Sequence, residues 1–346
     1  MNDLQVGLLM VGVVVLLIFA AYSTWQVSRR SPKQAKNTAL SDWHPPVVKE
    51  PSLVDAGVVD RPFGPPVLSF PEKKPGLDAL IDAIAPIALD APLTGRALLS
   101  VIPHVRRIGS KPFAIEGQNQ STLRWEFPVS DQFYTQLQTG VQLANRSGAL
   151  TDIEFSEFIQ KTQRLAETVN GTPNVPMMHT EVNRARELDQ FASDHDAQLR
   201  FVLRAQRSTW SPSYVLQTAA RHGFVAGGTA GRMVMPASST GMPSILSLTF
   251  DVQAAMADNT TQSVLNDVVL TLDVTHVNRH EFAFDKMRKA ALMLASDMEG
   301  SVTDDNGVVL TEIAMETIAD EMAHLYDALD RCEFSAGSPL ARRLFS

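Results

Sequence analysis

The feature that most constrains the fold is a pair of amphipathic helices that occurs twice in the chain. In the later copy, apolar residues recur at spacings of three and four, which places them on one face of each helix. These residues are Phe284, Met287, Ala291, Leu294 and Met298, followed by Met315, Ile318, Met322, Leu325 and Leu329. The same stripes occur about 130 residues earlier, from Phe155 to Val169 and again around Leu188 and Phe191. We interpret this as an internal repeat that predicts two units of one fold; the alternative is a chance likeness of two amphipathic helix pairs.

The signals between the paired helices recur as well. Gly300 is expected to cap the first late helix, as Gly171 is expected to cap its earlier counterpart. The run from Asp304 to Gly307 predicts a tight turn. Thr311 is the expected N-cap of the second late helix, and Thr180 takes the matching place in the earlier pair. Caps, glycines and stripes therefore align together.

Strand patterns precede each helix pair and define two units, residues 77–193 and 194–331. In both, the order is strand, helix, several strands, helix, turn, helix, with Thr94 and Ser211 as N-caps of the first helices. Pro86 in the opening strand suggests an edge position. We therefore predict an α+β fold with two tandem units, each an antiparallel sheet with helices on one face. The predicted strands are Leu80–Leu89, Phe113–Glu116, Arg124–Phe127 and Tyr134–Leu143, then Leu199–Leu203, Arg232–Met235, Ile245–Phe250 and Asp267–Val274.

An apolar stretch near the N-terminus predicts a single transmembrane helix within residues 1–28. Val6 to Tyr22 carries no charged or amide side chain, close to the about 20 residues that a helix needs to cross a bilayer. Basic residues follow it, so the N-terminus should face outward and the remainder the cytoplasm. A cleaved signal peptide is the alternative, but its charges normally precede the apolar core. The membrane-anchor residues are Val6, Leu16, Phe19, Tyr22 and Trp25, and the cytoplasmic basic residues include Arg29, Arg30 and Lys33.

Residues 29–76 form a proline-rich linker, and residues 332–346 are expected to be a flexible tail. Prolines recur throughout the linker and favour extended conformations, so it should act as a spacer between the membrane and the first unit. Docking of this segment to a partner is the alternative. The net charge of −8 argues against general affinity for nucleic acid. The single cysteine, Cys332, excludes an intramolecular disulfide and favours a reducing compartment.

Signatures of catalysis are missing from the sequence. The glycine-rich run 227–231 lacks a phosphate-binding lysine, and the acidic turn before Gly307 does not have calcium-loop spacing. His276 and His280 lie four apart without a third ligand in view. We therefore expect no enzyme activity, cofactor, metal site or small-molecule substrate. A binding protein is the best interpretation, because a sheet covered on one side leaves a face free for a peptide.

The second unit resembles the ZipA family, membrane anchors of the bacterial division ring that bind the tubulin-like protein FtsZ. The resemblance lies in residues 220–224, 243–250, 268–274 and 295–310, and in the order of membrane helix, linker and C-terminal domain. It implies a split β-α-β fold whose exposed sheet face takes the C-terminal tail of FtsZ. It also implies that this protein works by binding alone, at the division septum of the inner membrane. The alternative is a membrane-tethered adaptor for another division or envelope protein.

The resemblance also implies a set of peptide-binding positions. Several are polar where the family prefers larger apolar groups, which weakens capture of an apolar peptide by about 0.8 kcal/mol for each buried methylene lost. The contact with FtsZ is then weak, lies on the first unit, or is replaced by another partner. The implied positions are Val234, Thr249, Asp251, Val269, Thr271 and Asp273.

Overall fold

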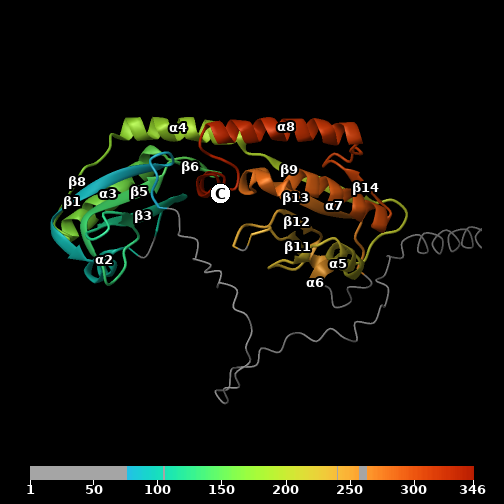
Figure 1. The fold of residues 1–346 in the computed structure, drawn as a ribbon, viewed down its shortest axis with the longest axis horizontal. Helices are drawn as coiled ribbons and strands as arrows, with labels where there is room; N and C mark the ends of the chain where they lie inside the picture. Colours follow the sequence, from blue (N-terminus) through green and yellow to red (C-terminus); the bar gives the residue numbers. More distant parts are fainter. Residues whose placement is uncertain (1–75, 104–105, 240, 257–262) are drawn as a thin grey trace, which may run out of the picture.

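The computed structural model describes residues 76–346 except 104–105, 240 and 257–262. The predicted transmembrane helix and nearly all of the linker lie outside the described residues. Within the described ranges, no helix combines the length and the apolar character needed to cross a bilayer. Two units, each with its own sheet, stand side by side in Figure 1.

The first unit is a mixed α+β structure around an antiparallel sheet. The strand order is β2-β3-β5-β1-β8, with β4 also pairing with β3. Thr94 caps α2, as predicted, by accepting a hydrogen bond from the amide of Ala97. The elements are β1 (Asp82–Thr94), α2 (Gly95–Val101), β2 (Arg107–Ile108), β3 (Lys111–Asn119), β4 (Trp125–Glu126), β5 (Phe133–Gln142), β6 (Ala144–Asn145), β7 (Gly148–Ala149), α3 (Asp152–Thr168), β8 (Gly171–Pro173) and α4 (Met178–His195).

The second unit is built in the same way. Its sheet has the order β10-β11-β12-β13-β9-β14, again antiparallel throughout. Ser211 and Thr311 cap α5 and α8, as predicted. The elements are β9 (Gln198–Ala205), α5 (Pro212–Arg221), β10 (Val225–Ala226), β11 (Arg232–Met235), β12 (Leu246–Thr249), α6 (Val252–Met256), β13 (Asp267–Asp273), η1 (Val274–His276), η2 (Arg279–Glu281), α7 (Ala283–Met298), β14 (Gly300–Thr303), α8 (Glu312–Arg331) and α9 (Pro339–Leu344).

The internal repeat is visible in the strand registers. Gly171 opens β8 and pairs with Leu89 of β1, as Gly300 opens β14 and pairs with Ala205 of β9. Two residues before these pairs along β1 and β9, Ile87 lies opposite Leu137 of β5 and Leu203 lies opposite Val268 of β13. Leu137 and Val268 are therefore equivalent positions. The residues before the two glycines, Asn170 and Glu299, both have a left-handed backbone with φ of 52°. The two units therefore share both topology and register.

Four local predictions are wrong. The paired helices are not joined by a turn alone, because β8 and β14 return to the sheet between them. Glu299, not Gly300, is the C-cap of α7, and α4 begins at Met178, two residues ahead of Thr180. Pro86 is not on an edge strand, because β8 covers the outer side of β1. The predicted tight turn at Gly307 does form, with φ of 85° and a hydrogen bond to the carbonyl of Asp304.

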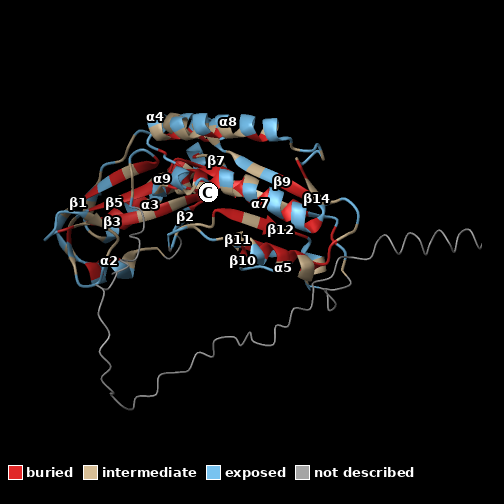
Figure 2. Ribbon diagram, turned by 45° about the vertical axis from the view of Figure 1, so that its right-hand side comes forward, coloured by how far each residue is buried: buried red, intermediate tan, exposed pale blue. Residues whose placement is uncertain are grey.

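Helices cover one face of each sheet and form a core there. In the first unit Phe155 and Phe158 of α3 pack against the sheet, and in the second unit Phe284 of α7 contacts Phe201 of β9 edge to face. Figure 2 shows the buried residues along the strands and the outer surfaces of α4 and α8 exposed. These two long helices run end to end along one side of both units (Figure 1). The helix-free face of each sheet is left for other contacts.

The C-terminal tail is packed between the two units, contrary to the expected flexibility. Leu344 and Phe345 are fully buried in a third cluster with Ile81 of the first unit and Leu329 of α8. The tail turns back after α8, and Gly337 donates a hydrogen bond to the carbonyl of Thr275. A short helix, α9, follows and is capped by Ser338. These apolar side chains are buried because they fill the space where the units meet. So short a segment has no periodic pattern from which this burial could be predicted.

Candidate functional site

The candidate site is the helix-free face of the second sheet. In antiparallel strands, directly opposite residues point to the same side of the sheet. Val234 lies opposite Ser247, which lies opposite Thr271. Thr249 lies opposite Val269, in the neighbouring row. The structure thus brings four of the six predicted positions, Val234, Thr249, Val269 and Thr271, together on one face.

These four side chains are half-buried, whereas their strand neighbours on the other side are part of the core. Val268, Leu270 and Leu272 of β13 are fully buried beneath the helices. Val269 and Thr271 lie between them in sequence and keep contact with solvent. The alternation creates a shallow surface of valine and threonine methyl groups without deep burial. We call the surface formed by Val234, Ser247, Thr249, Val269 and Thr271 the open face.

Arginines surround the open face and were not predicted as site residues. Arg200 lies opposite Thr271, Arg232 lies opposite Thr249, and Arg204 follows on β9 at the same side of the sheet. All three are exposed. Arg200 approaches Asp305 at 3.7 Å, but among the described residues no carboxylate forms an ion pair with Arg204 or Arg232. Arg200 and Arg204 alternate with buried residues along β9, and this pattern in the sequence could have predicted them as site residues. Their position places positive charge beside the open face.

Asp273 is on the same side of β13 but is already engaged. Arg146 of the first unit donates to both of its carboxylate oxygens, at 2.8 and 3.0 Å, and to Asp196 as well. His276 Nδ1 lies 3.2 Å from the Asp273 carboxylate. Burial would raise the pKa of Asp273, but the hydrogen bonds from His276 and Arg146 outweigh it and hold the pKa far below its usual value. Asp273 therefore joins the two units and closes one end of the open face.

This engagement predicts a pH-dependent contribution to stability. A carboxylate whose pKa is lowered by folding stabilises the protein above its unfolded pKa of about 3.9, and that stability is lost as the pH falls through the folded value. We expect Asp273→Asn to lower the free energy of unfolding by about 1–3 kcal/mol at pH 7 and by less at pH 3, because pH 3 lies below the unfolded pKa but above the folded one, so that part of the contribution is already lost. Urea denaturation at both pH values measures this. The exposed Asp267→Asn serves as control, and an equal loss at both pH values would contradict the interpretation.

Asp251 does not belong to the open face. It follows β12 and accepts a hydrogen bond from the amide of Gln253 at 2.8 Å, so its carboxylate sits at the start of the short α6. The strand ends at Thr249, and the intervening Phe250 is buried in the core. The resemblance implied Asp251 as a peptide-binding position, but the structure places it outside the open face because the chain has left the strand after Thr249.

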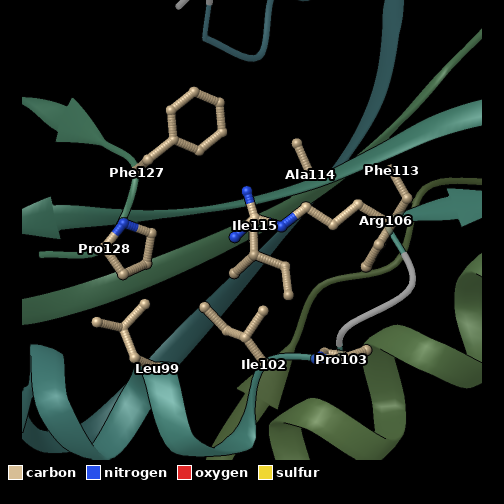
Figure 3. Close-up of a pocket in the computed structure, with 9 residues that line it drawn as sticks. All are labelled: Leu99, Ile102, Pro103, Arg106, Phe113, Ala114, Ile115, Phe127 and Pro128. Carbon is tan, nitrogen blue, oxygen red and sulfur yellow. The ribbon is translucent and has the colours of Figure 1, made fainter.

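An apolar pocket in the first unit is a second hollow of the surface. It lies between α2 and β3, where Leu99 and Ile102 face Ile115, and Phe127 and Pro128 complete the lining (Figure 3). Ala114, next to Ile115, points to the opposite side of the sheet in the same view. The pocket is thus on the helix side of the sheet, and the first unit's counterpart of the open face lies on the other side.

Comparison with known families decides the assignment of the second unit. Residues 242–321 match the family described as ZipA, C-terminal FtsZ-binding domain. This match supports placing residues 242–321 in the ZipA family. The matched residues include β12, β13, α7 and β14, and thus the two central strands of the open face. The ZipA-type domain is a protein-binding cell-division domain and does not define an enzyme family.

No curated protein matches the chain. The match does not extend to the first unit, whose likeness to the family stays a prediction.

Proposed function

We propose that this protein binds the C-terminal peptide of FtsZ on the open face of its second unit and tethers FtsZ polymers to the bacterial inner membrane. The observation that carries the proposal is the coincidence of the family match with a half-buried surface of valine, threonine and serine side chains that is bordered by arginines. The face takes an extended peptide through apolar side chains over Val269 and Thr271, while acidic groups of the peptide lie near Arg200, Arg204 and Arg232. No bond is made or broken, so binding is the whole mechanism.

The membrane part of the proposal rests on the sequence. The apolar stretch around Val6–Tyr22 would hold the chain in the bilayer with its N-terminus in the periplasm, and the proline-rich linker would give the cytoplasmic units their reach. The site of action would be the division septum. A membrane-tethered adaptor for another division or envelope protein is the second candidate, favoured by the threonines that stand on the open face.

The test is the binding of a labelled FtsZ C-terminal peptide to the full-length chain, followed by fluorescence anisotropy. We expect saturable binding that Val269→Lys or Thr271→Lys weakens at least tenfold, because each lysine would set an ammonium group where an apolar side chain docks. Gln136→Lys is the matched control, since it adds the same charge to the corresponding side of the first sheet, at an exposed position.

The variants separate the two candidates. Arg200→Glu should also weaken binding and reduce its dependence on salt, because it reverses a charge at the rim of the open face. Absence of binding to the folded wild-type chain would favour the adaptor. Equal losses in Gln136→Lys and Val269→Lys would show a general charge effect and would count against the open face.

A further inference from the structure

The first unit has a counterpart of the open face, and it is occupied by the chain itself. Residues 76–78 cross the helix-free side of the first sheet. The amide of Leu77 donates a hydrogen bond of 3.1 Å to Glu116 Oε1, and Gln138 Nε2 donates to the other oxygen of the same carboxylate at 2.8 Å. A Cβ added at Gly140 would lie only 2.4 Å from Leu77 Cδ2. The leucine side chain therefore rests directly on the glycine backbone.

The strand registers identify these residues with the open face of the second unit. Glu116 lies opposite Gln138 as Thr249 lies opposite Val269, and Ala114 lies opposite Gly140 as Ser247 lies opposite Thr271. The four positions of the first unit thus correspond, pair by pair, to four of the five positions that form the open face. They are Ala114, Glu116, Gln138 and Gly140 in the first unit, and Ser247, Thr249, Val269 and Thr271 in the second.

The helix-free face of the first sheet is more buried than the open face of the second, as expected if residues 76–78 cover it. Glu116 is only 3% exposed and Gly140 is buried, although both point away from the helices. Their counterparts Thr249 and Thr271 remain half-buried. A glycine in the middle of a strand weakens it and usually marks a close approach of another group. Here the absent side chain at position 140 leaves the hollow that Leu77 fills.

The occupying segment is fixed on both sides of Leu77. Arg343 of the C-terminal tail donates to the carbonyl of Gly76 at 3.0 Å, and the amide of Asp78 donates to Asp82 Oδ2 at 2.8 Å. Arg343 also forms an ion pair with Asp82. The segment is thus held on the helix-free face by one backbone amide bonded to a side chain of the sheet and by one apolar side chain in a hollow.

We propose that the helix-free face of the first sheet is a binding surface for a short segment with a leucine-type side chain, and that residues 76–78 occupy it as an intramolecular ligand. Tethering gives this segment a local concentration in the millimolar range or above, which outcompetes a free peptide of similar affinity. The inference does not require FtsZ as the partner of the second unit. It does imply that the intact chain offers one such face to other proteins, not two.

The test uses a cysteine reporter on each face. Ala114→Cys and Ser247→Cys, each in the full-length Cys332→Ser chain, occupy corresponding positions of the two sheets. We expect Leu77→Gly to raise the rate of thiol alkylation at position 114 at least tenfold and to leave position 247 unchanged. Leu77→Met should retain the slow rate, because methionine also fills the hollow. A circular-dichroism melt confirms that each variant is folded.

A second arm tests whether the face recognises a peptide. A synthetic peptide with the sequence of residues 72–81, added at millimolar concentration to the Leu77→Gly chain, should restore slow alkylation at position 114. The same peptide with glycine in place of leucine should not. Unchanged alkylation on removing Leu77, or failure of the leucine peptide to protect, would overturn the proposal. Neither outcome depends on whether the FtsZ peptide binds the second unit, so the two proposals fail separately.

Discussion

Replacing Arg343 with methionine should lower the free energy of unfolding by about 3–5 kcal/mol at pH 7, because it removes one partner of a buried ion pair. Asp82 is 1% exposed, and Arg343 lies 2.5 Å from its carboxylate. The same guanidinium holds the carbonyl of Gly76. Methionine keeps much of the side-chain volume, so the loss is mainly electrostatic. The uncompensated carboxylate would remain where water cannot reach it.

The dependence of this effect on pH follows from the pKa of Asp82. Burial raises this pKa, and Arg343 opposes the increase, so removing Arg343 raises the pKa further. When folding raises the pKa of a carboxyl group, the folded state is favoured while that group is protonated. The stability that the group contributes is then lost as the pH rises. The deficit of Arg343→Met should therefore be largest at pH 7 and shrink towards pH 4.

Urea denaturation of the full-length chain at pH 7 and pH 4.5 measures both quantities. Arg186→Met is the matched control, because Arg186 is exposed and lies 3.9 Å from Asp152. Exposed pairs of this kind contribute about 0–1 kcal/mol. A loss below 1 kcal/mol at pH 7 for Arg343→Met, or a deficit that grows on acidification, would contradict the role assigned to the pair.

Trp210→Ala should destabilise the second unit by about 3–5 kcal/mol, the usual cost of truncating a large buried aromatic residue. Trp210 is fully buried, and its indole Nε1 donates a hydrogen bond of 2.8 Å to the carbonyl of Met298. Its ring also lies against Gly300, where an added Cβ would approach within 2.9 Å. Alanine would leave a cavity and an unpaired carbonyl at the junction of α7 and β14.

Trp210→Phe separates these two contributions, because it restores most of the volume but not the hydrogen bond. We expect it to recover more than half of the lost stability in thermal and urea denaturation. The FtsZ peptide should still bind the folded fraction of both variants, since Trp210 lies on the helix side of the sheet. An alanine variant as stable as the wild type would show that the second core tolerates the void and would refute the packing described here.

Much of the fold was predictable because helices and their caps are local. The apolar stripes of α3, α7 and α8, and the N-caps Thr94, Ser211 and Thr311, depend on residues a few positions apart. β8 and β14 were missed because three or four residues beginning with glycine show no alternation. Their stability comes from pairing with β1 and β9, far away in sequence.

The positions of the candidate site came from the resemblance, and the structure places Val269 and Thr271 on the helix-free side of β13, as the alternation along the strand requires. Asp273 has the same alternation, yet Arg146 engages it from 127 residues away in the sequence. The prediction of a flexible tail was wrong because of a similar long-range contact. Phe345 is buried only because two separate units meet around it. Contacts between units leave no periodic signal in either partner.

The position of the tail has a consequence for biosynthesis. The ion-pair partner of Asp82 is Arg343, which lies 261 residues further along the chain. The amide of Arg146 likewise donates a hydrogen bond to the carbonyl of Ser346. Both units precede residues 334–346 in the chain, so their sheets can pair before these residues are made. The packing of the tail between the units can form only after residues 334–346 have left the ribosome. Until then Gly76 lacks its contact with Arg343, so the segment around Leu77 is held on the first sheet only by its contacts with Glu116 and Gly140.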